Sequence, residues 1–233
     1  AMFTMMNEAR QGVGIQGLSV SERSYQQAAA FARERLQGTR SDGSRYPIIE
    51  FPDVRRMLML MRSATEAMRG LAYVAGFESD RAHYASAPEQ ARKHAARVGL
   101  YTPIVKGWLT ELAQEVTYLG IQVHGGMGYI EETGSAQFYR DARIMTIYEG
   151  TTGIQALDLA GRKTLGDKGE ALQALLDEIR ASAESMSGVA SLAVMAEALK
   201  RAVEGAAEAR AWLLENGSRD RNAVGAASVN FML

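Results

Sequence analysis

A chain of 233 residues, of which 47% are hydrophobic, can bury an ordinary globular core and is not disordered. Its 26 basic and 27 acidic residues nearly cancel, which argues against a nucleic-acid partner or an acidic membrane surface, since both require a basic face. The lack of cysteine excludes disulfides, thiolate metal sites and a cysteine nucleophile. We expect no membrane span, because no apolar run reaches about 18 residues, and take a cytoplasmic location as the default.

The stretches between the four prolines are rich in strong helix formers, and no convincing period-two segment appears. Apolar residues return to one helix face at three- or four-residue steps, as in Ile104, Trp108, Leu112, Val116 and Leu119. In chain order, we expect helices over residues 2–37, 53–83, 88–121, 134–145, 152–164, 169–186 and 189–216. Turn-forming residues predict loops at 38–52, 84–90 and 123–134. The pattern therefore predicts an all-α protein built as an up-and-down bundle.

The chain begins and ends within apolar, helix-like segments, unlike the polar ends of most domains. We therefore expect a fragment of a longer protein.

The three histidines, His83, His94 and His124, form no pair at helical spacing, so no metal site is expected. The segment "QVHGGMGY" has two interpretations of about equal weight. Its glycines could form a bare turn between helices, or they could let a flat or charged ligand approach the backbone.

Glu149 precedes a Gly-Thr-Thr-Gly turn, and it also has two interpretations. In the plainer one, Thr151 or Thr152 caps a helix and the carboxylate lies near the positive end of the helix dipole. In the sharper one, the carboxylate stands at the end of an apolar wall, which would remove water and make it a stronger base toward a carbon acid. The wall consists of Ile144, Met145, Ile147 and Tyr148.

Taken together, these motifs resemble the C-terminal helical domain of the acyl-CoA dehydrogenases. The matching text is "QVHGGMGYIEETGSAQFYRDARIMTIYEGTTGIQALDLAGRK", Gln122 to Lys163. "MNEARQGVGIQGL" and "FARERLQGTR" extend the likeness to residues 1–164. The sequence is most similar to a large bacterial branch of this family, which includes enzymes for 3-methylmercaptopropionyl-CoA. In that branch, residues 165–233 would be an additional helical segment, here truncated.

The resemblance implies that Glu149 removes the α-proton of a bound acyl-CoA while FAD takes the β-hydrogen as hydride, giving a 2-enoyl-CoA. It also implies substrate contacts for Arg10 and Gly150. The implied FAD-binding residues are Arg35, Gln122, Gly125, Gly126 and Thr151. Two departures from the family pattern, "ERLQG" without its usual Phe and Gly153 in place of a Gln, indicate altered flavin packing.

The resemblance implies a homo-oligomer, a dimer or tetramer, that passes electrons to an electron-transfer flavoprotein. Two alternatives stay open: an acyl-CoA oxidase, which returns electrons to O₂, and a non-catalytic helical oligomerisation module. The family's N-terminal and middle domains are absent from these residues. We therefore expect the chain alone to bind FAD poorly and to be inactive.

Overall fold

The computed structural model describes the backbone of residues 2–233 and the side chains of residues 5–233. The elements are mostly helices, which confirms the predicted all-α class. They form two compact units that are described separately. Unit 1 contains the chain as far as Phe77 together with Val105–Thr152, and unit 2 contains Glu78–Ile104 and Gly153–Leu233. The expected boundary after residue 164 stays a prediction.

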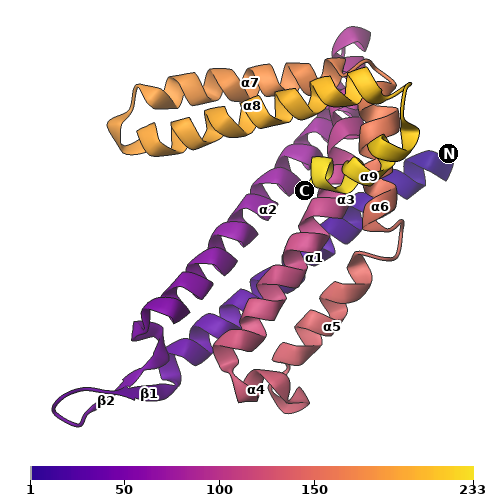
Figure 1. Ribbon diagram of the computed structural model, residues 1–233. Coiled ribbons are helices and arrows are strands. Elements are labelled where there is room, and N and C mark those ends of the chain that lie inside the picture. Colours follow the sequence, from indigo (N-terminus) through magenta and orange to yellow (C-terminus); the bar gives the residue numbers. More distant parts are fainter. Residues whose placement is uncertain (1) are drawn as a thin grey trace. The chain divides into compact units, whose positions relative to one another are not determined.

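Unit 1 is an up-and-down arrangement of long helices (Figure 1). It holds α1 (Met2–Glu34), the first part of α2 (Pro52–Tyr84), the second part of α3 (Pro88–His124) and α5 (Ser135–Met145). Two hydrogen bonds fix α5 antiparallel to α1. Gln27 donates to the Thr133 carbonyl just before α5, and the Tyr148 hydroxyl donates to Gln16 just after it.

Small residues let the helices of unit 1 approach closely. A Cβ added at Gly14 of α1 would lie 2.6 Å from the Val105 carbonyl oxygen of α3, and one added at Gly120 of α3 would lie 2.2 Å from Ser24 Oγ of α1. The core between α1, α2 and α3 is correspondingly rich in alanine. Its buried members are Ala28, Ala29, Ala32, Ile48, Met57, Leu58, Met61, Val116 and Val123.

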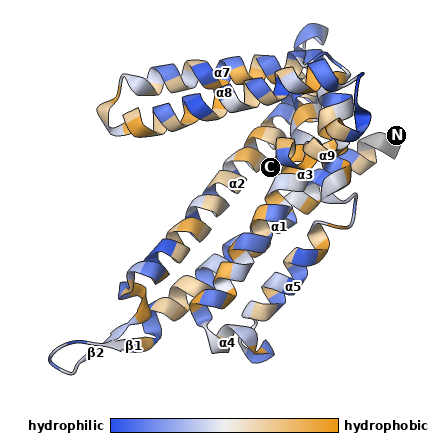
Figure 2. Cartoon of the chain, viewed as in Figure 1, coloured by the Kyte–Doolittle hydropathy of each residue, from blue (hydrophilic) through white to orange (hydrophobic). Residues whose placement is uncertain are grey.

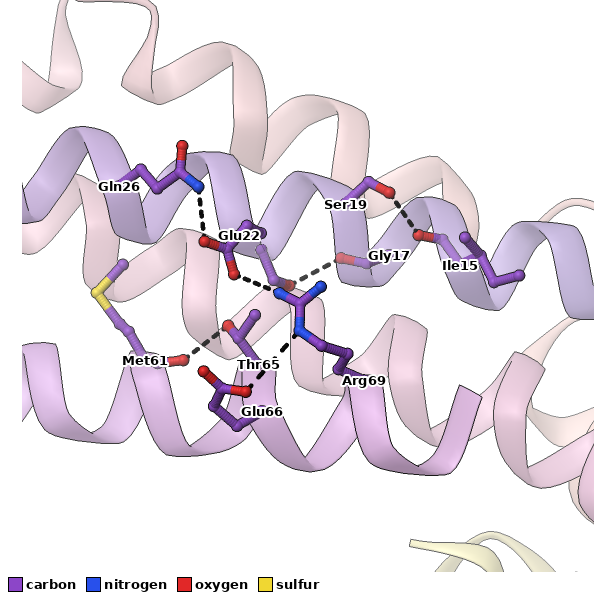
Figure 3. A network of polar contacts seen from close by, with 10 residues as sticks. Ile15, Gly17, Ser19, Glu22, Gln26, Met61, Thr65, Glu66 and Arg69 are labelled. Carbon is purple, nitrogen blue, oxygen red and sulfur yellow. Dashed lines mark hydrogen bonds and ion pairs between the residues drawn. The ribbon is translucent and has the colours of Figure 1, made fainter. Parts of the chain in front are cut away.

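A polar network joins α1 to α2 beside this core (Figure 3). Arg69 of α2 pairs with Glu22 of α1 at 2.6 Å, and Gln26 donates to the same glutamate at 2.7 Å. Glu66, one turn before Arg69, lies 3.8 Å from the guanidinium. Because both ends of the Glu22–Arg69 pair are partly buried, the pair helps fix the register of the two helices.

The segment after α1 differs from the prediction. The helix ends at Glu34 rather than at residue 37, and the expected loop contains a hairpin of β1 (Leu36–Thr39) and β2 (Arg45–Pro47), followed by the 3-10 turn η1 (Ile48–Glu50). Gly38 pairs with Tyr46, and a Cβ at Gly38 would lie 2.1 Å from that ring. The glycine therefore makes room for an aromatic ring across the strand.

The glycine-rich segment 123–134 is also more helical than expected, since it contains the short helix α4 (Gly126–Tyr129) and the 3-10 turn η2 (Glu131–Thr133). The predicted helix at 152–164 is confirmed, although only its first part, α6 (Thr152–Leu157), is α-helical. The chain then continues as the π-helix η3 (Asp158–Leu165).

Unit 2 is dominated by the antiparallel hairpin of α7 (Glu170–Ser187) and α8 (Ala193–Asn216), joined by the 3-10 turn η4 (Ala190–Leu192). Apolar and polar residues alternate along both helices in Figure 2. The prediction missed the last helix, α9 (Arg221–Met232), whose start is capped by Asp220 accepting from the backbone of Asn222 and Ala223. The buried core residues are Leu100, Ala156, Leu159, Leu172, Leu176, Val203 and Met232.

Within residues 2–233, no helix combines the length and the apolar character needed to cross a bilayer.

Two glycines of α1 test the close helix packing. Gly14→Ala places a methyl group against the Val105 backbone, so we expect it to lower the free energy of unfolding by about 1–3 kcal/mol. Gly12→Ala is the matched control: a Cβ there meets nothing within 4 Å, and better helix propensity should raise stability by up to about 1 kcal/mol. Urea unfolding followed by circular dichroism measures both. Equal effects of the two substitutions would contradict the packing account.

Candidate active site

The turn that carries Glu149 connects α5 to α6 and has an uncommon backbone. The helix ends as Ile147 and Tyr148 both donate to the Ile144 carbonyl, at 2.9 and 3.1 Å. Glu149 then has φ +54° and Gly150 φ +98°. The left-handed region disfavours a residue with a side chain by roughly 1 kcal/mol or more. This strain persists only because the surrounding structure fixes the turn on both sides.

Side-chain hydrogen bonds tie the turn to both neighbouring helices of unit 1. The Tyr148 hydroxyl donates to the Gln16 side chain of α1, and the Thr152 hydroxyl donates to the Glu111 carboxylate of α3. The two ends of the turn also meet, because the Thr152 backbone N–H donates to the Thr146 carbonyl at 3.1 Å. The plainer interpretation of the sequence has Thr151 or Thr152 cap a helix, but the Thr152 hydroxyl donates to Glu111 of α3.

The predicted apolar wall around Glu149 is wrong for this chain. Of the four proposed members, Met145 is buried and Tyr148 is half-buried, whereas Ile144 and Ile147 expose 52% and 44% of their surface. Glu149 is itself exposed. Residues 144 to 149 form the end of α5 and the start of the turn. Their side chains therefore spread around the chain instead of gathering on one face. These residues therefore do not keep water from the carboxylate.

Charged groups gather beside this turn. Arg10 of α1, predicted to lie near the substrate, is 8% exposed, and Lys106 of α3 is completely buried. Burial lowers the pKa of Lys106 to about 8; the charges of Glu111 and Glu149 oppose this shift, and that of Arg10 adds to it. Burial also raises the pKa of Tyr148, and the Glu149 carboxylate raises it further. Glu149, Arg10, Lys106 and Glu111 therefore form one electrostatic cluster.

Three of the predicted FAD-binding residues, Arg35, Gly125 and Gly126, line a single cavity of about 430 Å³. Gly125 has φ +61°, and a Cβ added at either glycine would meet nothing within 4 Å, so the backbone is open to a ligand. The Arg35 guanidinium supplies positive charge and donates to Gln37 at 3.2 Å. This combination of an arginine with open backbone fits the diphosphate of a dinucleotide. The other lining residues are Phe31, Gln37, Ile48, Val123, His124 and Met127.

The other two predicted FAD-binding residues do not line that cavity. Gln122 is exposed and accepts a hydrogen bond from Gly125 N–H at 3.1 Å through its carbonyl, so it supports the turn. Thr151 lies in the Glu149 turn, which is bound to α3 at Glu111. Glu111 and the cavity residue His124 are about 20 Å apart along the axis of α3. The predicted set thus divides into two separate regions of unit 1.

Sequence reasoning missed three residues of these regions. His124 was considered only for a metal site; it donates from Nδ1 to the Gly120 carbonyl at 2.7 Å and packs against Phe31, with ring centroids 4.5 Å apart. Lys106 and Glu111 received no role, since a lysine and a glutamate five positions apart on a helix look like ordinary surface charges. A useful signal was available for Lys106, because it directly follows the apolar residues Ile104 and Val105.

Comparison with known proteins assigns these features to a family. The family model described as "Acyl-CoA dehydrogenase, C-terminal domain" matches residues 1–164. A curated relative, 3-methylmercaptopropionyl-CoA dehydrogenase of Ruegeria pomeroyi, is 47% identical over the whole chain. The chain spans 40% of that relative's length. These matches confirm the resemblance predicted from the motifs between Gln122 and Lys163.

Solved structures show the same fold over nearly the whole chain. Caenorhabditis elegans ACDH-11, in complex with C11-CoA, has a TM-score of 0.83 at 20% identity, covering 98% of this chain and 37% of its own. An acyl-CoA dehydrogenase from Bacillus anthracis, complexed with FAD, has a TM-score of 0.74 at 24% identity, covering 99% of this chain and 40% of its own. At these identities the likeness concerns the fold alone.

The buried lysine makes the stability of the chain depend on pH. Lys106 titrates near pH 8 in the folded chain and near 10.5 when unfolded, so the unfolded chain binds more protons between these values. The contribution of this group to stability therefore rises as pH increases through that window, and at pH 7 its burial costs on the order of 3 kcal/mol.

We expect Lys106→Met to raise the free energy of unfolding at pH 7 by up to about 3 kcal/mol, with the gain shrinking as pH rises from 8 to 10. Urea unfolding at several pH values measures this. Lys93→Met, at an exposed lysine of the same helix, is the control and should change little. A loss of stability at pH 7, or a gain that is the same at every pH, would be the contrary result.

Proposed function

Because this chain belongs to the acyl-CoA dehydrogenase C-terminal domain family, we propose that it carries the proton acceptor of a flavin-dependent acyl-CoA dehydrogenase, and that this acceptor is Glu149. The observation that carries the proposal is the turn at Glu149. A strained left-handed glutamate, bound through its neighbours to α1 and α3, is costly to maintain. Such strain is found most often where a side chain must hold one position for chemistry.

In the proposed reaction, a Glu149 carboxylate oxygen takes the α-proton of an acyl-CoA thioester. The electron pair of that C–H bond forms the Cα=Cβ double bond as the β-hydrogen leaves with its own pair, giving a 2-enoyl-CoA. FAD, when bound, supplies the acceptor for this hydride. Gly150, which has no side chain, leaves the approach to the carboxylate open, and Arg10 adds a positive charge to the cluster that contains Glu149.

Because Glu149 is exposed, the proposed chemistry requires something else to shield its carboxylate from water. A carboxylate in water is a weak base toward a carbon acid, so the site must be covered when it reacts. The bound acyl chain and further polypeptide would provide that cover. Since the chain spans only 40% of the 3-methylmercaptopropionyl-CoA dehydrogenase that it matches, a complete enzyme would have residues available for this purpose.

The division of the FAD-binding residues favours an oligomer. Thr151 lies beside Glu149, whereas Arg35, Gly125 and Gly126 line the cavity about 20 Å farther along α3. In this proposal the two regions serve different FAD molecules, so that Arg35 and its glycines reach the cofactor of a neighbouring copy in a dimer or tetramer. An electron-transfer flavoprotein would then reoxidise the FAD. Rapid O₂ consumption without it would indicate an oxidase instead.

Because the predicted FAD-binding residues are divided between two regions, we expect the chain alone to bind little FAD and to be colourless. With only its own residues to hold FAD, the 233-residue chain purified alone should lack flavin absorbance between about 350 and 500 nm and should not oxidise acyl-CoA. The absorption spectrum after FAD addition and gel filtration measures this. Stoichiometric retention of yellow FAD would show that these residues suffice for the cofactor site.

Replacing the proton acceptor should abolish the reaction. In a complete enzyme containing this chain, Glu149→Gln keeps the size of the side chain and removes its basicity. We expect FAD to stay bound and its bleaching by acyl-CoA to slow by at least about 10³-fold, measured anaerobically by stopped flow. Glu132→Gln, at another exposed glutamate of unit 1, should bleach normally. Unchanged bleaching in the Glu149 variant would refute the assignment.

A further inference from the structure

Gln16 of α1 is the residue through which the turn at Glu149 is attached to the first helix. Its side-chain oxygen accepts a hydrogen bond from the hydroxyl of Tyr148, the residue directly before Glu149. Gln16 is exposed and Tyr148 is half-buried, so water competes for this bond. Such a bond contributes only modestly to the stability of the whole chain. Its main effect is therefore local, and it falls on the turn that carries Glu149.

Close backbone packing fixes the part of α1 that carries Gln16. A Cβ added at Gly14 would lie 2.6 Å from the Val105 carbonyl oxygen of α3, and one added at Gly17 would lie 3.2 Å from the Leu109 carbonyl oxygen. Because these contacts are made with backbone on both sides of Gln16, α1 has little freedom to shift or rotate here. Gln16 therefore offers the turn an acceptor at a fixed place.

The other attachment of the turn starts from the same stretch of α3. Glu111, two residues after Leu109, accepts the Thr152 hydroxyl. The turn is also closed on itself, because the Thr152 backbone N–H donates to the Thr146 carbonyl at 3.1 Å. Both attachments thus refer to one segment of α3, directly through Glu111 and by way of α1 through Gln16.

We propose that Gln16 is a positioning residue for Glu149, a role that rests on the proposed function: by holding Tyr148 it fixes the turn and with it the direction of the Glu149 carboxylate. Glu149 has φ +54°, a conformation that a residue with a side chain leaves readily when its neighbours are released. Displacing a reacting group by about 1 Å can cost about 10²-fold in rate. Gln16 touches no reacting atom and transfers no proton in this role.

Amide hydrogen exchange in the 233-residue chain, followed by NMR, tests the role without any activity. The Thr152 N–H reports on the turn, since its bond to the Thr146 carbonyl lasts only while the turn is closed. We expect Gln16→Met, which keeps the length of the side chain but has no oxygen acceptor, to speed exchange of this N–H by about 2- to 10-fold. Tyr148→Phe, which removes the donor, should do the same, and the two substitutions together should add little to either alone.

Gln26→Met, at another exposed glutamine of α1, is the control: it removes a hydrogen bond to Glu22 and should leave the exchange of Thr152 unchanged. Unaltered Thr152 exchange in Gln16→Met and Tyr148→Phe would overturn the proposal. An increase no larger than that of the amides in the core of α1 would reflect unfolding of the whole unit and would overturn it as well.

A second arm uses a complete enzyme that contains this chain and follows anaerobic flavin bleaching at several acyl-CoA concentrations. Gln16→Met should lower the limiting rate by about 10-fold or more and change the half-saturating acyl-CoA concentration by less than about 3-fold, because positioning acts on the chemical step. A change in the half-saturating concentration alone would assign Gln16 to substrate binding and contradict the positioning role. Normal bleaching in Glu149→Gln, with Thr152 exchange still dependent on Gln16, would instead refute the proposed function.

Discussion

Side-chain hydrogen bonds attach the turn between α5 and α6 to two helices, and the candidate site depends on these attachments. Tyr148 binds Gln16 of α1 and Thr152 binds Glu111 of α3. Between these attachments Glu149 is kept in a left-handed conformation that a free loop would abandon. The helices themselves can hold the turn only because glycines such as Gly14 let α1 lie against the backbone of α3.

Electrostatics adds a second constraint on the same residues. A fully buried lysine destabilises the chain at neutral pH. Its charge is partly compensated by Glu111 and Glu149 through space, and among the described residues its Nζ has no hydrogen-bond partner. Stability is thus given up in the part of unit 1 where the proposed chemistry takes place. This is the usual relation between a catalytic centre and the scaffold that carries it.

Much of the fold follows from the sequence, because helix-forming residues and apolar spacing identify the long helices within a few residues. The β1–β2 hairpin does not, since it depends on the Tyr46 ring packing over Gly38, a contact that no periodicity shows. Motif order pointed to Glu149, whose role stays a proposal. It also pointed to Arg35 and Gly125, and these two line one cavity. The predicted apolar wall failed because neighbours in sequence, such as Ile144 and Ile147, are turned outward at a helix end. For Lys106 the sequence offered only its apolar neighbours Ile104 and Val105 as a signal, and its complete burial made the group evident.

The central claim is that the Glu149 carboxylate removes a proton from carbon, and exchange of that proton tests it most directly. An acyl-CoA analogue with sulfur in place of the β-carbon has no β-hydride to give, so its α-hydrogens can exchange with D₂O without any oxidation. In a complete enzyme containing this chain, we predict enzyme-catalysed α-deuteration, followed by NMR, that disappears with Glu149→Gln while FAD stays bound. Exchange at the wild-type rate in that variant would contradict the account.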